Sequence, residues 1–92
     1  MNKARRKQIE KIIARLEDLK SSLESIHEDV EGVQSDEQEA FDNIPENLQD
    51  SERYETAEAA VDALDSAEGG FEEVTDCIDS IIDYLNEATG EA

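Results

Sequence analysis

The sequence predicts an all-α protein, an antiparallel hairpin of two long helices that dimerises into a four-helix bundle or coiled coil. Apolar residues recur at alternating spacings of three and four residues in two long segments, which is the periodicity of one helix face. A proline-containing segment separates these two segments of similar length. The chain, residues 1–92, is short enough to form a single domain.

The first helix is predicted over about residues 3 to 42. Its apolar side chains form an unbroken heptad seam, because spacings of three and four residues bring them to one face. Gly32 and the capping-box pair Ser35 and Gln38 would allow a break near residue 34. The seam consists of Ile9, Ile12, Leu16, Leu19, Leu23, Ile26, Val30 and Val33.

The turn is predicted over residues 43–50. Pro45 cannot continue a helix, and it disfavours helical geometry at Ile44. A short helical turn can start at the proline itself. Asp50 or Ser51 is then expected to cap the next helix, because both side chains accept hydrogen bonds from free backbone N–H groups.

The second helix is predicted over about residues 51–89. Gly69 and Gly70 should weaken it locally, since each glycine costs about 1 kcal/mol relative to alanine. The apolar spacing continues across both glycines, so we expect a soft spot and no chain reversal. The seam consists of Ala57, Ala60, Leu64, Ala67, Phe71, Val74, Ile78, Ile81, Leu85 and Ala88.

Two helices joined by a short link are expected to pack antiparallel. This orientation places the basic start of the first helix beside the acidic end of the second. Opposite charges then favour it over parallel packing, although each exposed pair contributes only about 0–1 kcal/mol. The residues expected to face one another are Lys3, Arg6, Lys7 and Lys11 on the first helix, and Asp76, Asp79, Asp83, Glu87 and Glu91 on the second.

A homodimer is predicted from the width of the apolar stripes. A single small core rarely supplies more than about 3–5 kcal/mol, and the stripes are wider than two helices require. Ile13, Val61, Ile82 and Tyr84 provide the extra width. The predicted oligomer seam comprises Leu16, Leu23, Val30, Leu64, Phe71, Ile78 and Leu85.

The charge is large and unevenly distributed. Lys and Arg number 8 against 26 Asp and Glu, which gives a formal net charge of −18. Residues 1–20 carry seven bases and three acids (+4), whereas residues 21–92 carry one base and 23 acids (−22). The basic arm comprises Lys3, Arg5, Arg6, Lys7 and Lys11. The acidic tip comprises Asp36, Glu39, Asp42, Glu46, Asp50, Glu52 and Glu55.

No catalytic residue, metal ligand or cofactor is predicted. The chain has one histidine, His27, and its one cysteine, Cys77, lies in an acidic setting that disfavours a reactive thiolate. Glu24 and His27 have the Glu-x-x-His spacing of di-iron bundles. Because Ile26 belongs to the seam, however, Glu24 falls on the flank of the helix. We therefore expect a protein that is not an enzyme.

The sequence also predicts a cytoplasmic protein of a bacterial host cell, without membrane contact. No segment approaches the roughly 18 apolar residues that span a bilayer. The N-terminus is basic but lacks the apolar core of a signal peptide. A lone cysteine permits no intramolecular disulfide, which suits a reducing compartment.

The segment Ala40–Tyr54, with the sequence AFDNIPENLQDSERY, resembles a turn found in small acidic helical proteins of phages and prophages of Gram-positive bacteria. These proteins share the pattern N-(hydrophobe)-P-E-x-L-Q-x-S-E-R, followed by an acidic helix rich in Ala and Leu. The likeness covers roughly residues 38–88. It implies an origin in a mobile element, and such proteins are similar to DNA mimics among anti-restriction and anti-CRISPR proteins. It supplies no functional residues.

Three functions remain open from the sequence. The leading prediction is a DNA-mimic inhibitor that binds a protein partner with a basic surface through the acidic tip. The second is a coiled-coil structural or assembly adaptor, in which the seam itself is the functional surface. The third is a nucleic-acid binder that uses the basic arm. The third is disfavoured because the remaining −22 charge repels phosphates and the arm has no aromatic residue for base stacking.

Overall fold

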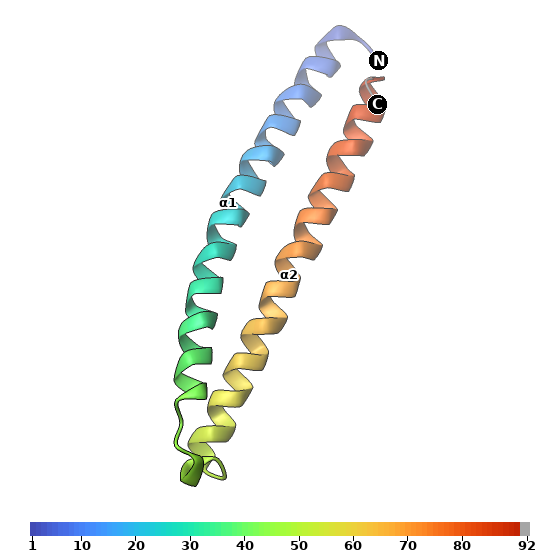
Figure 1. Cartoon of the computed structure of the whole chain (residues 1–92). Helices are drawn as coiled ribbons and strands as arrows, with labels where there is room; N and C mark the ends of the chain where they lie inside the picture. Colours follow the sequence, from blue (N-terminus) through green and yellow to red (C-terminus); the bar gives the residue numbers. More distant parts are fainter. Residues whose placement is uncertain (91–92) are drawn as a thin grey trace. The chain divides into compact units, whose positions relative to one another are not determined.

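The computed structural model describes residues 1–90 and shows an all-α chain (Figure 1). Helix α1 spans Lys3–Asp42, the short 3-10 helix η1 spans Glu46–Leu48, and helix α2 spans Glu52–Thr89. The two long helices contact each other and run in opposite directions, and the described part of the chain contains no strand. The predicted helical hairpin is therefore confirmed, while dimerisation stays a prediction.

Helix α1 is continuous from Lys3 to Asp42. The side-chain Oδ1 of Asn2 accepts a hydrogen bond from the backbone N–H of Arg5 at 2.8 Å, so Asn2 caps the N-terminus. Gly32 causes no interruption, and the break that the sequence allowed near residue 34 is not present.

Pro45 and Ser51 shape the connection between the two long helices. Pro45 has φ −57° and ψ 146°, which ends α1 and begins η1. The hydroxyl of Ser51 donates to the carbonyl oxygen of Leu48 at 2.5 Å and accepts from the backbone N–H of Tyr54 at 3.2 Å. Of the two expected capping residues, Ser51 performs the role.

Helix α2 continues without interruption through Gly69 and Gly70, as the seam spacing predicts. It ends at Thr89, whose hydroxyl donates to the carbonyl oxygen of Asn86 at 2.8 Å. Gly90 follows with φ +82°, the left-handed conformation that commonly terminates helices and that glycine adopts without steric cost.

The chain divides into two compact units, which are described separately below. Unit 1 consists of residues 1–25 and 72–92, of which residues 91 and 92 are not described. Unit 2 consists of residues 26–71 and contains the connection between the helices. Each unit pairs a segment of α1 with a segment of α2.

One row of the predicted seam, which we call the central column, packs between the helices in both units. Its residues lie seven apart on each helix, and all of them are buried or half-buried. The seven residues predicted as an oligomer seam belong to this column and contribute to packing within the chain. The column comprises Ile9, Leu16, Leu23 and Val30 on α1, and Ala57, Leu64, Phe71, Ile78 and Leu85 on α2.

The second row that packs is the flanking column, four residues after each central position. Ile13, Val61 and Ile82, expected only to widen the stripe, lie in it and are buried or half-buried. Its polar members are also half-buried or buried. They are Lys20, His27 and Gln34 on α1, and Glu68, Thr75 and Thr89 on α2.

The remaining row of the predicted seam, the open column, lies three residues after each central position. In unit 1, Ile12, Leu19, Val74 and Ile81 are between 43 and 48% exposed. In unit 2, Ile26 and Val33 on α1 are at least half exposed. The packing within the chain thus uses only half of the predicted seam.

In unit 2, an aromatic contact near the connection lies on the flanking side of the helices. The rings of Phe41 and Tyr54 lie 4.8 Å apart between centroids, and both residues belong to the flanking side. Ile44 is buried beneath the turn, with 9% exposure, and Val61 is 6% exposed. These contacts lie on the flanking side of the helices, and the open column of this unit faces outward on α1.

Candidate partner-binding surfaces

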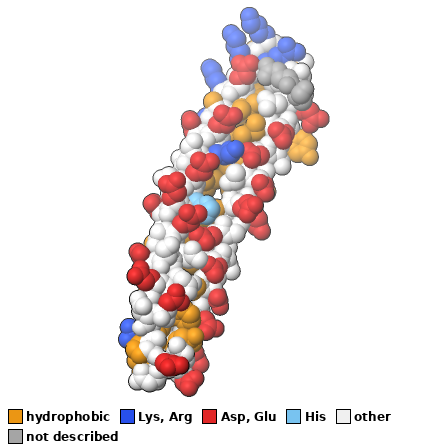
Figure 2. Space-filling view, in the orientation of Figure 1, with side chains coloured by type: hydrophobic (Ala, Val, Ile, Leu, Met, Phe, Trp, Pro, Cys, Tyr) orange, Lys and Arg blue, Asp and Glu red, His pale blue; other side chains and the backbone are white. Residues whose placement is uncertain are grey.

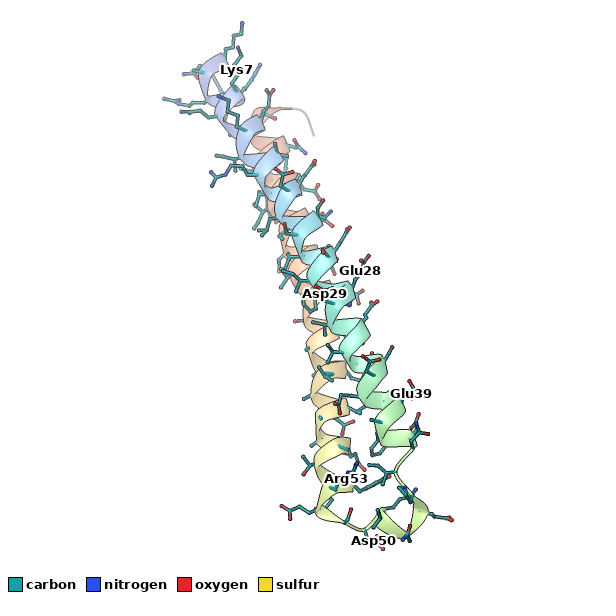
Figure 3. The ribbon with its side chains drawn as sticks, turned by 90° about the vertical axis from the view of Figure 1, so that its left-hand side faces the viewer. Lys7, Glu28, Asp29, Glu39, Asp50 and Arg53 are labelled. Atoms are coloured by element: carbon teal, nitrogen blue, oxygen red, sulfur yellow. The ribbon has the colours of Figure 1, made fainter. Side chains whose placement is uncertain are left out.

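The acidic tip belongs to unit 2, at the end of α1, in the connection and at the start of α2. The side chains of Glu39 and Asp50 project away from the helices in Figure 3. All seven residues of the acidic tip are exposed: Asp36, Glu39, Asp42, Glu46, Asp50, Glu52 and Glu55.

Unit 2 as a whole is strongly negative. Residues 26–71 contain 15 Asp and Glu against Arg53 alone, a formal charge of −14. Within these residues only His27 and Glu31 lie within ion-pair distance, at 3.2 Å, and that pair is ionic only when the imidazole is protonated. The carboxylates of the acidic tip form no ion pair with the described residues, and among them Asp42 accepts a hydrogen bond from Nε2 of Gln38 at 3.0 Å.

The charge density of unit 2 approaches that of duplex DNA. Its α2 segment from Glu52 to Phe71 contains 20 residues and extends about 30 Å at 1.5 Å per residue. Duplex DNA carries about 18 charges over that length, at one per ~1.7 Å. The parts of α1 and α2 in unit 2, without Glu46 and Asp50 of the connection, carry a formal charge of −12, which is about two-thirds of the DNA value.

The basic arm lies at the start of α1, in unit 1, and Figure 2 shows Lys and Arg side chains gathered at that end. Lys3, Arg5, Arg6, Lys7 and Lys11 are all exposed. None of the five lies within 4.0 Å of an acidic oxygen in the described chain. The expected cross-helix pairs of Lys3, Arg6, Lys7 and Lys11 are thus not formed as ion pairs, and Glu91 lies outside the described residues.

Unit 1 instead joins its helices through Lys20 and Asp79, whose Nζ and Oδ1 atoms lie 2.6 Å apart. The hydrogen bond to Asp79 raises the pKa of Lys20 above its ordinary value, and desolvation opposes this shift. A raised lysine pKa in the folded state contributes stability below the unfolded pKa, and this contribution is lost as the pH rises through the folded pKa. The ammonium group of Lys20 is therefore charged at neutral pH.

A shallow apolar groove lies on the open side of α1 in unit 1, lined by Ile12, Arg15, Leu16 and Leu19. Helix α2 contributes Val74 and Ile81 to the open column of the same unit. Because the helices are antiparallel and each open column follows its central column by three residues, both columns lie on one side of the pair. Unit 1 therefore presents an apolar strip to solvent.

His27 lies in a cluster of side chains that the sequence did not indicate. Its ring stacks on Phe71 with centroids 4.8 Å apart and an interplanar angle of 10°. Glu31 from α1 and Glu68 from α2 lie beside it, and one ligand atom from each of the three lies within 4.8 Å of the others. Glu24, the partner suggested by spacing, lies in unit 1 and lines a groove beside Lys20.

Two further observations bear on function. Cys77 is exposed and forms no disulfide among the described residues. In the same part of the chain, no helix is long and apolar enough to cross a membrane.

No protein-family model matches the chain, and no curated protein or solved structure shows significant similarity to it.

Proposed function

We propose that the chain is a small binding protein that engages the basic surface of a nucleic-acid-handling protein through the carboxylates of unit 2. In this proposal it imitates the phosphates of duplex DNA and blocks the site where DNA would bind. The observation that carries the proposal is the charge of −14 on unit 2, which ion pairs within the unit leave almost wholly unneutralised.

The physical basis is electrostatic steering. A dense row of exposed carboxylates attracts a complementary basic groove and accelerates encounter, most strongly at low salt. Long carboxylate side chains on helices also present oxygen atoms outward, as phosphates do. Glu39 on α1 illustrates this direction in Figure 3, and Asp50 in the connection between the helices also projects outward.

The proposal includes an origin in a mobile element, supported by the resemblance of the turn Ala40–Tyr54 to acidic phage and prophage proteins. An inhibitor of a host defence protein fits such an origin, since restriction and related systems act on DNA through basic surfaces. The expected setting is the cytoplasm of the bacterial host cell.

A pull-down tests this function. The tagged full-length chain is incubated with a lysate of a Gram-positive bacterium, washed at about 50 mM and then about 200 mM salt, the range over which phosphate-type binding weakens strongly. We expect one basic nucleic-acid-handling protein to be retained in the first wash and lost in the second. Retention of structural proteins alone, unaffected by salt, would contradict the proposal.

We also propose that two chains associate through the open column of unit 1. Unit 1 carries seven bases against ten acids among its described residues, a formal charge of −3, whereas unit 2 carries −14. A second copy can therefore approach unit 1 with little repulsion. The strip is continuous with the central column, so a second hairpin would extend the existing packing into a four-helix bundle.

Light scattering tests the dimer, with a mass of twice 10.3 kDa expected. Leu19→Glu places a charge in the open column and should return the mass to that of one chain. Ala14→Glu adds the same charge at an exposed position outside the packed and open columns, and should leave the dimer intact. A single-chain mass for the unmodified protein would contradict the prediction.

The open column also supports a second candidate function, the coiled-coil adaptor. Nearly half-exposed Ile12, Leu19, Val74 and Ile81 could bind an apolar helix of another protein instead of a second copy. In the pull-down, such a partner would survive the high-salt wash and would be lost with Leu19→Glu. The DNA-mimic function predicts instead that the partner is lost in the high-salt wash and still binds the Leu19→Glu variant.

A further inference from the structure

The cluster of His27, Glu31 and Glu68 contains one imidazole and two carboxylates, from both helices of unit 2. The Nε2 atom of His27 lies 3.2 Å from Oε1 of Glu31. One ligand atom of each residue lies within 4.8 Å of the other two. His27 and Glu68 are half-buried, and Glu31 lies at the exposed edge.

Two members of this cluster occupy half-buried positions in the packing between the helices. His27 and Glu68 belong to the flanking columns, which elsewhere carry both apolar residues such as Val61 and polar residues such as Gln34. A half-buried carboxylate facing an imidazole and a second carboxylate carries a desolvation cost unless a cation compensates it. The His27 ring is also held in orientation by its stacking on Phe71.

We propose that these three residues bind a divalent first-row transition-metal ion, with Zn²⁺ as the reference ion. A neutral imidazole nitrogen and two carboxylate oxygens are accepted ligands of such ions, at about 2.0–2.2 Å from the metal. Small side-chain rotations would bring the three ligand atoms from their present separations to this distance. The two carboxylates balance the charge of the ion, and the exposed side of the site leaves room for water ligands.

The site joins α1 to α2, so the bound ion would hold the two helix segments of unit 2 together. A ligand that binds only the folded state stabilises it in proportion to the logarithm of its concentration. The surrounding charge of −14 raises the local concentration of any cation. The three ligands lie outside the acidic tip, so metal binding can be measured without the protein partner of the DNA-mimic function.

Isothermal titration of the full chain with Zn²⁺ tests the site, in Cys77→Ser protein so that the exposed thiol cannot bind the metal. Excess Mg²⁺ occupies the many open carboxylates. We expect one Zn²⁺ per chain and a higher melting temperature. Loss of outer-shell partners alone weakens metal sites by about 10- to 100-fold, so His27→Gln or Glu68→Gln should weaken binding at least as much.

The matched control is Glu24→Gln, which removes the carboxylate at the Glu-x-x-His spacing and should change the affinity less than twofold. Glu31→Gln provides a second ligand variant at an exposed position, so that a fold defect cannot explain its effect. Circular dichroism of each metal-free variant establishes that the helices are intact. Equal Zn²⁺ binding by all variants, or no binding above the Mg²⁺ background, would overturn the site.

Discussion

Replacing Ile78 by alanine is expected to remove most of the stability of the hairpin. Ile78 is 5% exposed, among the three buried apolar residues of the described chain. Large-to-small substitutions of buried isoleucine cost about 2–5 kcal/mol, and a core of this size supplies only about 3–5 kcal/mol. Urea denaturation followed by circular dichroism should show a much lower midpoint, or no folded baseline.

Ile81→Ala is the matched control. It removes the same atoms as Ile78→Ala, less than one helical turn further along α2, but the Ile81 side chain is 47% exposed. At low protein concentration it should cost less than about 1 kcal/mol, since the side chain loses little packing. A larger cost that appears only at high concentration would report the loss of dimer contacts. Equal effects of the two substitutions at every concentration would contradict the observed division between central and open columns.

Reversing three charges of the acidic tip is expected to abolish partner binding. Asp42→Lys, Glu46→Lys and Glu52→Lys together change the formal charge of unit 2 from −14 to −8 and place cations against the basic partner. Like charges brought together at an interface cost several kcal/mol, so the affinity should fall by about 100-fold or more. The binding constant for the protein captured in the pull-down measures this loss.

The control for this variant reverses Glu72, Glu73 and Asp76, which are exposed in unit 1. It makes the same change in net charge and should weaken binding only slightly. Circular dichroism is needed for the tip variant, because Glu52 lies in the first turn of α2, where an acid stabilises the helix. If both triple variants bound equally well or equally poorly, the acidic tip would have no specific role.

Much of the fold follows from spacing alone. Alternating three- and four-residue intervals require long helices, and Pro45 requires the chain to leave α1 before it. The spacing does not determine the rotation of each helix about its axis, which decides the columns that pack between the helices. The open column with Leu19 and the flanking column with Lys20 both fit an amphipathic helix, and local spacing favours the first. In the structure the second packs within the chain, and the contact of Phe41 with Tyr54 lies on the same side.

The candidate sites, like the fold, could be predicted from the sequence only in part. The exposure of acidic-tip residues such as Asp42 and Glu46 could be predicted, because charged side chains on helix faces and turns remain solvated. The cluster at His27 could not, because Glu68 is distant in sequence and approaches only through the rotation of α2. Its one local sign is a run of polar residues in the flanking column, Lys20, His27 and Gln34, seven residues apart.

The most direct test of the proposed mimicry is competition between this chain and a DNA duplex for the captured partner. A labelled duplex is bound to the partner, and unlabelled chain is added while fluorescence anisotropy is measured at low salt. Mimicry predicts that the chain releases the duplex completely and that the charge-reversed acidic tip does not. A stable ternary complex, with the duplex still bound at saturating chain, would contradict it.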